Sequence, residues 1–469
     1  MAAIDHLMLS MDQPGPPPII TGFLEFERPL DFKRLEAAVQ DRLLRHERFK
    51  KRVCRPAGPV ETARWETDAN FDLKAHLFVA PAPYPGNKEQ LQALFSSLAS
   101  KPLDPERPLW QIHYIKNIES GGSLLFFRVH HCIADGIAMA QLLVSLTDED
   151  PGARPGARLN GSNAATRKHP KTALRRPPQG GKKLCDAGDF AIRGFKNVLS
   201  NPCYAKKRVK TAGQAFSEGA GTIARVLMLP PDSRFFFKGE RGHKRGIAWS
   251  EPLPLADVKK AAAHFNATVN DIVVALATGG LRRYLKQHED LEGKPGIRMA
   301  IPVNLRPPGS ERADHVALEN RIGFLLAELP VYIRNPGRRI RRVRNMLNRL
   351  KQSSDMVFAW AGLHALGTVP PDMARKTAYH LAGKITGIIS NVPGPGRSLC
   401  FAGEKLKKVM FWLPLLKGLS LGISIISYNN AVFMGIVTDS RIVPDPETIS
   451  GHIEDEFKAL LAQCGSETE

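Results

Sequence analysis

Two adjacent histidines are the residues in this chain best suited to chemistry. His130 and His131 are followed, after three intervening residues, by Asp135 and Gly136. The unperturbed imidazole pKa of about 6.5 lets a histidine accept a hydroxyl proton and return it near neutral pH. Such general base catalysis contributes roughly 10²–10⁴-fold in rate. The motif His130–Gly136 therefore indicates activation of a hydroxyl group.

A β-hairpin is expected to position the two histidines. The runs Gln111–Ile118 and Leu124–Val129 are apolar, aromatic and β-branched, and the turn residues Ser120–Ser123 separate them. Side chains alternate between the two faces of a strand, so His130 and His131 are expected to point in opposite directions. One histidine can then face a cleft while the other faces the core.

The two residues that end the motif begin the next element. Gly136 allows a tight turn or a close backbone approach at a strand-to-helix corner, and Ile137–Leu146 is expected to form a buried helix. The Asp135 carboxylate can orient a histidine, lock the turn through an arginine, or cap the helix. The sequence alone leaves these roles open.

The motif has other interpretations. A pair of histidines at a strand end can have a purely structural role. His130, His131 and Asp135 could also ligate a metal, although opposite facing of the histidines argues against a shared ion. Cys132 could act as a nucleophile beside His131, but neighbouring strand residues point apart.

Charge is distributed unevenly along the chain. Lysine and arginine number 66 against 46 acids, which gives a net charge of +20. The stretch 161–210 is rich in basic residues and its only acids are Asp186 and Asp189, while 331–351 contains no acid. Such a field suits anionic headgroups, the phosphates of coenzyme A, or nucleic acid, and composition does not choose among them.

Contact with a membrane is expected from the side. No apolar run reaches the ~18 residues that spanning requires, and the first residues do not resemble a secretory signal. The six cysteines lie far apart, which favours a reducing compartment over a disulfide framework or a zinc site. In Arg338–Leu350, apolar residues recur at helical spacing among arginines, as in an interfacial helix or a core helix with a basic outer face.

Length and composition predict two domains joined by a linker. We expect an N-terminal domain over 1–150, a basic linker rich in proline and glycine over 151–245, partly helical around Gln214–Leu229, and a C-terminal domain over 246–469. The expected helices are Asp31–Arg45, Leu255–Phe265, Ile272–Leu285 and Pro446–Leu461, and the expected strands are Gly246–Trp249, Ile385–Ser390, Leu421–Ser427 and Val432–Val437.

A family resemblance narrows the chemistry. The pattern His-His-x-x-x-Asp-Gly at 130–136 resembles the motif shared by chloramphenicol acetyltransferase, condensation domains of peptide synthetases, and wax ester synthase/diacylglycerol acyltransferases. The companion motifs are Pro108-Leu109-Trp110, Asn270-Asp271, Pro302-Val303-Asn304-Leu305-Arg306 and Ser390-Asn391-Val392-Pro393-Gly394-Pro395. In this order they resemble the bacterial wax ester synthase/diacylglycerol acyltransferase family. The resemblance implies an α/β fold of two chloramphenicol acetyltransferase-like domains joined by a crossover linker, with an active-site channel at their interface.

The same resemblance implies a direct acyl transfer. His131 would take the proton of an alcohol, and the alkoxide would attack the carbonyl of an acyl-CoA and expel the thiolate. His130, Asp135 and Gly136 would support His131. No metal and no cofactor besides the acyl-CoA co-substrate are expected. The acceptor that the resemblance implies is a fatty alcohol, diacylglycerol or another hydroxyl lipid, and the sequence does not choose among them.

The companion motifs supply further candidate contacts. Asn270 is a candidate polar contact for the oxyanion, and Asp271 is a weaker candidate for a direct role in the site, although Thr268–Asp271 also fits a capping box that starts a helix. Trp110 is expected to line the channel or to anchor the hairpin, and Asn391 to line the channel or to form a rigid turn.

One departure and several rival functions remain open. Family members usually carry Pro-Met-His near the N-terminus, where this chain has Gln13–Ile20. Rivals are a condensation-type acyltransferase that uses carrier-protein thioesters, a glycerolipid acyltransferase with His130 as base, and a basic scaffold at a lipid surface or on nucleic acid. We expect a cytoplasmic protein peripheral to the inner membrane face or to lipid droplets, without nucleic acid. Oligomeric state is not set by the sequence.

Overall fold

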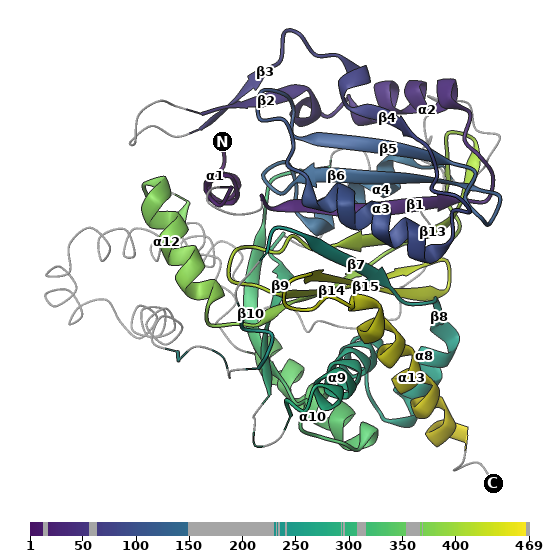
Figure 1. Ribbon diagram of the computed structural model, residues 1–469, viewed down its shortest axis with the longest axis vertical. Helices are drawn as coiled ribbons and strands as arrows, with labels where there is room; N and C mark the ends of the chain where they lie inside the picture. Colours follow the sequence, from purple (N-terminus) through teal and green to yellow (C-terminus); the bar gives the residue numbers. More distant parts are fainter. Residues whose placement is uncertain are drawn as a thin grey trace, which may run out of the picture.

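The computed structural model describes residues 1–12, 17–55, 63–148, 229–306, 316–352 and 366–465, apart from positions 231, 233–234, 240–241, 292, 294–295 and 368. Two β-sheets organise the described residues, one above the other in Figure 1, with helices on their outer faces. The expected α/β class is confirmed. The expected linker 151–245, with its helical segment Gln214–Leu229, lies outside the described residues up to position 228.

The first sheet holds the histidine motif and combines distant parts of the chain. Its strand order is β12-β13-β1-β6-β5-β4. The strands are β1 (Ile19–Phe26), β4 (Leu77–Ala80), β5 (Trp110–Lys116), β6 (Ser123–His130), β12 (Cys400–Phe401) and β13 (Glu404–Trp412). β1 pairs antiparallel with both β6 and β13. Two strands from the expected C-terminal domain therefore complete the N-terminal sheet.

The predicted hairpin is confirmed. β5 and β6 pair antiparallel from Trp110 opposite Val129 to Lys116 opposite Ser123. Gly121 in the turn has φ +78°, a conformation that favours glycine. The hairpin brings the end of β6, and with it His130, beside the start of β1 at Ile19.

Helices and a short ribbon surround the first sheet (Figure 1). The helices are α1 (Ala3–Ser10), α2 (Phe32–Ala38), α3 (Lys88–Ser100) and α4 (Gly136–Leu146), and β2 (Lys51–Cys54) pairs with β3 (Arg64–Thr67). Asp31 caps α2 by accepting a hydrogen bond from the Arg34 N–H at 2.9 Å. The α-helical part ends at Ala38 and a π-helical turn, η1 (Val39–Leu43), replaces the rest of the expected helix. Short 3-10 turns, η2 (Glu47–Lys50) and η3 (Leu73–Ala75), link the strands.

The second sheet is mixed. Its order is β10-β9-β11-β14-β15-β7, with β8 on β15. The strands are β7 (Arg245–Trp249), β8 (Leu253–Pro254), β9 (Ile297–Asn304), β10 (Ile322–Leu329), β11 (Gly387–Pro393), β14 (Leu421–Tyr428) and β15 (Ala431–Asp439). β11 runs parallel to both β9 and β14, and the other pairs are antiparallel. The predictions of strands at β7, β11, β14 and β15 are confirmed.

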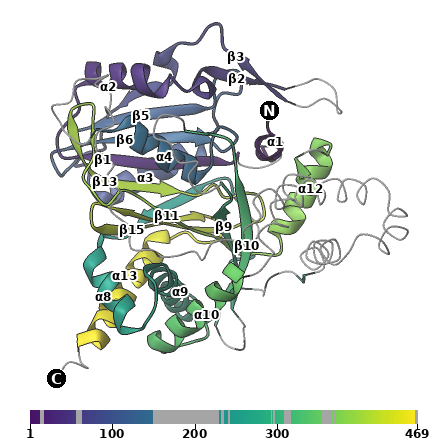
Figure 2. The ribbon, with the colours of Figure 1, turned by 180° about the vertical axis from the view of Figure 1, so that it is seen from behind.

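Four helices cover the outer face of the second sheet (Figure 1). They are α8 (Leu255–His264), α9 (Val269–Gln287), α10 (Pro336–Gln352) and α13 (Pro446–Gly465), and the sequence predicted a helix at each of these places. Figure 2 shows α12 (Pro371–Ala382) beside α1 at the edge of the molecule. In the described part of the chain, no helix is both long enough and apolar enough to cross a bilayer.

The position of α10 corrects one expectation. Ile340, Val343 and Leu347 are buried in the core between this helix and the second sheet. The apolar stripe therefore packs inward, and the interpretation of 338–350 as a helix that inserts into an interface is wrong. The alternative, core packing with a basic outer face, describes the helix.

Candidate active site

Asp135 connects the motif to the helix that follows it. Its carboxylate is fully buried and accepts hydrogen bonds from the N–H groups of Ile137 at 3.1 Å and Ala138 at 2.9 Å. These two donors belong to the first turn of α4, where backbone N–H groups have no helical partner. Asp135 is thus the N-cap of α4, one of the three roles that the sequence left open.

The same carboxylate binds an arginine from the second half of the chain. Arg306 Nη1 lies 3.1 Å from Asp135 Oδ1 and Nη2 lies 2.8 Å from Oδ2. The Arg321 N–H donates to Oδ2 at 3.0 Å, and Arg306 also donates to the Glu319 carbonyl at 2.7 Å. Among the described residues no hydrogen bond joins Asp135 to a histidine side chain. Asp135 therefore also fixes the turn after the motif through its ion pair with Arg306, a second role that the sequence left open.

Both ring nitrogens of His130 are occupied. Nε2 lies 2.7 Å from Asp12 Oδ1, and the Cys132 N–H donates to Nδ1 at 3.1 Å. Asp12 is itself ion-paired with Arg55. Burial lowers the pKa of His130, while Cys132 and the hydrogen bond to Asp12 raise it, and the net direction is upward. The N–H of Cys132 nevertheless favours an imidazole whose single proton sits on Nε2. His130 has no nitrogen left for a substrate.

His131 is held by its backbone, and its ring stays unoccupied by the described residues. Its N–H donates to the Pro18 carbonyl at 2.8 Å, and its carbonyl accepts a hydrogen bond from Asn320 Nδ2 at 2.8 Å. Nδ1 is enclosed without a partner, while the residue as a whole keeps 9% exposure. Burial is the main reason that the pKa of His131 is lowered, although Asp135 and Asn320 oppose the shift. The ring is therefore neutral near pH 7, as a general base requires.

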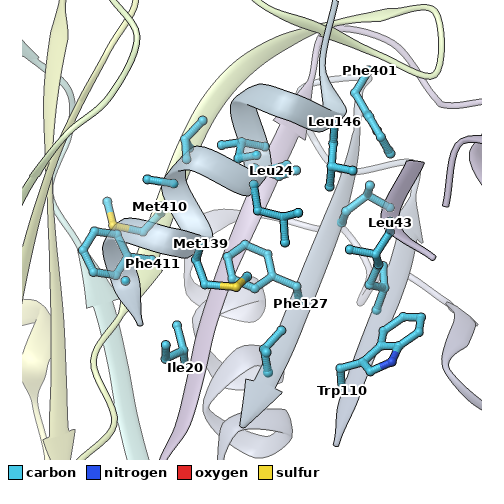
Figure 3. Close-up of a pocket in the computed structure, with 18 of the residues that line it drawn as sticks. Ile20, Leu24, Leu43, Trp110, Phe127, Met139, Leu146, Phe401, Met410 and Phe411 are labelled. Atoms are coloured by element: carbon cyan, nitrogen blue, oxygen red, sulfur yellow. The ribbon is translucent and has the colours of Figure 1, made fainter. Parts of the chain in front are cut away.

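An apolar cavity lies between α4 and the first sheet. It measures about 990 Å³ including its open side. Figure 3 shows side chains from α4, β1, β6 and β13 arranged around it. It is lined by Ile20, Leu24, Val39, Leu43, Phe49, Trp110, Ile112, Leu125, Phe127, Val129, Gly136, Met139, Ala140, Leu142, Leu143, Leu146, Val392, Phe401, Val409, Met410, Phe411 and Ile426. It reaches the motif at Gly136, while neither histidine is part of its wall.

Gly136 serves a purpose other than the one expected. A Cβ at this position would meet no atom within 4 Å, and its φ is not in the left-handed region. Neither a tight turn nor a close backbone approach explains the glycine, so that expectation is wrong. The missing side chain instead leaves the end of the cavity open beside the motif.

Trp110 lines the cavity and also anchors the hairpin. It is 1% exposed, and its indole N–H donates to the Phe49 carbonyl at 2.8 Å. Its ring stacks on that of His76, with 4.6 Å between the ring centroids. The expected anchoring role is confirmed, because the buried indole fixes the position of β5 and also presents an apolar face to the cavity. A contact of Trp110 with substrate stays a prediction.

The asparagines of the companion motifs pair with each other. Asn391 Nδ2 donates to Asn270 Oδ1 at 2.9 Å and ties the start of α9 to β11. Val392, the next residue on β11, faces the cavity, so Asn391 points to the opposite face of the sheet. Among the described residues no hydrogen bond joins either asparagine to the histidine motif. A direct contact of Asn270 or Asn391 with an oxyanion stays a prediction.

Asp271 forms the predicted capping box. Its Oδ2 accepts a hydrogen bond from the Thr268 N–H at 2.8 Å, and its own N–H donates to Thr268 Oγ1 at 3.2 Å. The carboxylate is 1% exposed. The structure therefore gives Asp271 a structural role at the start of α9.

Three residues near the histidines escaped the sequence analysis. Asp12 holds His130, Asn320 holds His131, and Asp5 holds Asn320 through a hydrogen bond of 2.7 Å. None belongs to the motifs that drew attention, and Asp5 and Asn320 are 315 positions apart. The departure at Gln13–Ile20 also contributes, because Pro18 fixes the backbone of His131.

Comparison with known proteins shows which family the chain resembles. The model of the wax ester synthase/diacylglycerol acyltransferase catalytic domain matches residues 1–273, and that of the family's C-terminal domain matches 318–461. O-acyltransferase WSD of Acinetobacter baylyi is 26% identical over 483 residues, covering 98% of this chain and 97% of that protein. A Mycobacterium tuberculosis protein described as a probable diacylglycerol O-acyltransferase is 27% identical over 420 residues, covering 88% and 85%.

Solved structures share the fold. The wax ester synthase/diacylglycerol acyltransferase from Marinobacter aquaeolei superposes with a TM-score of 0.67 at 22% identity and covers 98% of both chains. The first condensation domain of the calcium-dependent antibiotic synthetase gives a TM-score of 0.62 at 15% identity, covering 98% of this chain and 96% of that one. Because the catalytic-domain model matches more than half of the sequence, the chain belongs to the wax ester synthase/diacylglycerol acyltransferase family.

Proposed function

We propose that this protein is an O-acyltransferase that moves a long-chain acyl group from acyl-CoA to a fatty alcohol or diacylglycerol, with His131 as general base. One observation carries the assignment of the base. Of the two adjacent histidines, His130 has both nitrogens occupied, whereas the ring of His131 is neutral and has no partner among the described residues. The names of the family and of its relatives supply the two acceptor classes.

The chemistry needs only the histidine and the two substrates. The lone pair on Nε2 of His131 takes the proton of the acceptor hydroxyl, and the alkoxide oxygen attacks the thioester carbonyl. The tetrahedral intermediate collapses by breaking the C–S bond, and the thiolate takes the proton back from His131. The products are an ester and free coenzyme A. In this proposal no metal, cofactor or covalent acyl-enzyme takes part.

The cavity beneath α4 suits a hydrocarbon chain. Its lining residues are apolar, so it offers a headgroup almost no hydrogen bonds and gains free energy by burying methylene groups, about 0.8 kcal/mol for each. Its contact with Gly136 brings one end of a bound chain to the motif. We assign the cavity to the chain of one of the two substrates.

We further propose that the protein attaches peripherally to an anionic surface, either the cytoplasmic face of the membrane or a lipid droplet. α10 contains no acidic residue, and Arg338, Arg341, Arg342 and Arg349 are exposed on it. Each basic residue near an anionic lipid surface contributes about 1 kcal/mol. Insoluble acceptors are found at such surfaces, which makes attachment useful to the reaction.

Product analysis tests the proposed reaction. The purified full-length protein is given palmitoyl-CoA with hexadecanol or diacylglycerol in parallel, without any carrier protein, and the lipids are identified by mass spectrometry. We expect an ester with at least one acceptor and a loss of at least about 100-fold in His131→Ala, since general base catalysis contributes that much. Activity only with carrier-protein thioesters would support a condensation-type enzyme instead. Full activity of His131→Ala would end the proposed mechanism.

A further inference from the structure

We infer that Asn320 is a positioning residue for His131: it holds the imidazole as the tautomer that carries its proton on Nδ1, so that Nε2 is free to act as the base. The inference rests on the proposed role of His131. Asn320 lies in the segment that leads into β10, 189 positions after the histidine. It is 4% exposed, so its polar atoms need partners inside the protein.

The contacts of Asn320 determine which way its amide points. One amide atom lies 2.8 Å from the His131 carbonyl oxygen and 2.7 Å from Asp5 Oδ1. Both of these atoms are acceptors, so the amide atom between them must be the NH₂ nitrogen, which has two hydrogens to donate. The flipped amide would place an oxygen against two oxygens. The position of the Asn320 amide oxygen, Oδ1, is therefore fixed by the two acceptors around the nitrogen.

The amide oxygen of Asn320 could accept a hydrogen bond from the buried nitrogen of the His131 ring. Asn320 Oδ1 and His131 Nδ1 are both fully buried, and each lacks a hydrogen-bond partner among the described residues. Asn320 and the carbonyl of His131 itself both act to raise the pKa of the His131 ring, against the lowering caused by burial. A proton on Nδ1 would supply the donor that the buried Asn320 Oδ1 lacks, whereas a lone pair on Nδ1 would leave both buried atoms without a donor. The buried surroundings of the ring therefore favour the neutral tautomer with its proton on Nδ1, which leaves the lone pair of Nε2 free.

Asp5 holds Asn320 in place. Its Oδ1 accepts from both the backbone N–H of Asn320, at 3.3 Å, and Nδ2, and its Oδ2 lies 2.9 Å from Arg48 Nη2. Burial raises the pKa of Asp5, and Arg48 and Asn320 oppose that shift. Arg48 also donates to the Ile133 carbonyl at 2.9 Å. These contacts connect α1, the histidine motif and the segment before β10 around the side-chain amide of Asn320.

Nuclear magnetic resonance tests the tautomer without relying on activity. The chain has 14 histidines, and in protein labelled with ¹⁵N only at histidine the His131 signals are those that disappear in His131→Ala. We expect the wild-type protein to show a neutral His131 ring with Nδ1 protonated and Nε2 unprotonated. A ring protonated on Nε2 in the wild type would overturn the inference, even if His131 is the base.

Kinetics of Asn320→Ala give a second test. We expect kcat to fall about 10- to 100-fold with KM little changed, a part of the roughly 10²–10⁴-fold that a general base supplies. The acid limb of the kcat/KM profile should move to lower pH, because an acceptor that stabilised the imidazolium is gone. A merely structural role would lower the amount of folded enzyme and leave the pH profile in place.

The controls separate the two ways of failing. Tyr284→Phe removes a part-buried hydrogen bond to Asp445, the residue before α13, remote from the motif, and should lower the melting temperature without moving the pH profile. If His131→Ala is inactive while Asn320→Ala keeps the wild-type kcat and pH profile, the inference fails and the proposed function stands. If His131→Ala is fully active, the proposed function fails first.

Discussion

Asp135 and Arg306 form a two-pronged ion pair across 171 positions of the chain, with Nη–Oδ distances of 3.1 and 2.8 Å. The aspartate caps the helix that follows the histidine motif, and the arginine follows β9 of the second sheet. Both side chains are at least 90% buried. The pair therefore fixes the motif of one sheet against the other sheet, and its purpose is positional rather than chemical.

Loss of Arg306 should destabilise the protein. Arg306→Ala would leave the Asp135 carboxylate buried without its charge partner, and breaking a buried pair from one side costs about 3–5 kcal/mol. We expect the free energy of unfolding in urea to fall by that amount, with activity falling too. Arg321→Ala is the matched control, because among the described residues its side chain pairs only with Glu319, at the surface, and its backbone N–H still donates to Asp135. Equal stability of the two variants would contradict the role given to the ion pair.

Gly136 should set the length of chain that the enzyme accepts. The Cβ of Gly136→Ala has free space, and a helical alanine restricts the unfolded chain, so this variant should be more stable by about 0.4–1 kcal/mol. The side chain of Gly136→Leu should extend into the cavity and exclude long chains. We expect its product profile, measured with acyl-CoA and alcohol substrates from eight to eighteen carbons, to shift toward shorter chains. An unchanged profile would show that the cavity does not bind substrate.

The pH dependence of activity should report a histidine that resists protonation. Burial lowers the pKa of His131 below the ordinary value of 6.5. The base is needed in its neutral form, so kcat/KM should stay level through neutral pH and fall only below pH 6.5. The measurement is kcat/KM against pH at constant ionic strength. An acid limb centred above 6.5 would mean that another group, or a charged His131, limits the reaction.

A second histidine should make stability, rather than activity, sensitive to acid. His113 stacks on Phe78, and burial lowers its pKa to about 4. Between pH 6.5 and 4 the unfolded chain binds a proton that the folded chain does not, so stability falls as the pH falls through this window. The loss by pH 4 should be on the order of 1–3 kcal/mol. His113→Phe keeps the aromatic contacts and should flatten the dependence of melting temperature on pH. A dependence as steep as that of the wild type would assign the titration elsewhere.

Local sequence patterns predicted the elements that depend on local interactions. The hairpin before His130 and the capping box at Thr268 follow from alternation and from side chains three positions apart, and the structure confirms both. The pairing of β13 with β1 and the contact of Asp5 with Asn320 join residues far apart in the chain, and no period or spacing encodes them. Gly136 was misjudged because a cavity beside a glycine is visible only in three dimensions.

The basic face of α10 should control binding to anionic membranes. Arg341 and Arg342 are exposed on the same helix whose apolar residues are buried, so they can be changed without disturbing the core. At about 1 kcal/mol for each charge, Arg341→Gln with Arg342→Gln should weaken binding to vesicles containing phosphatidylserine by roughly 30-fold. Co-sedimentation at low and high salt measures the effect, and Asn345→Gln with Asn348→Gln on the same helix is the uncharged control. Binding that depends neither on these arginines nor on the anionic lipid would contradict the proposed electrostatic attachment. It would not affect the proposed acyl transfer, because these arginines are not among the residues that hold the histidine motif.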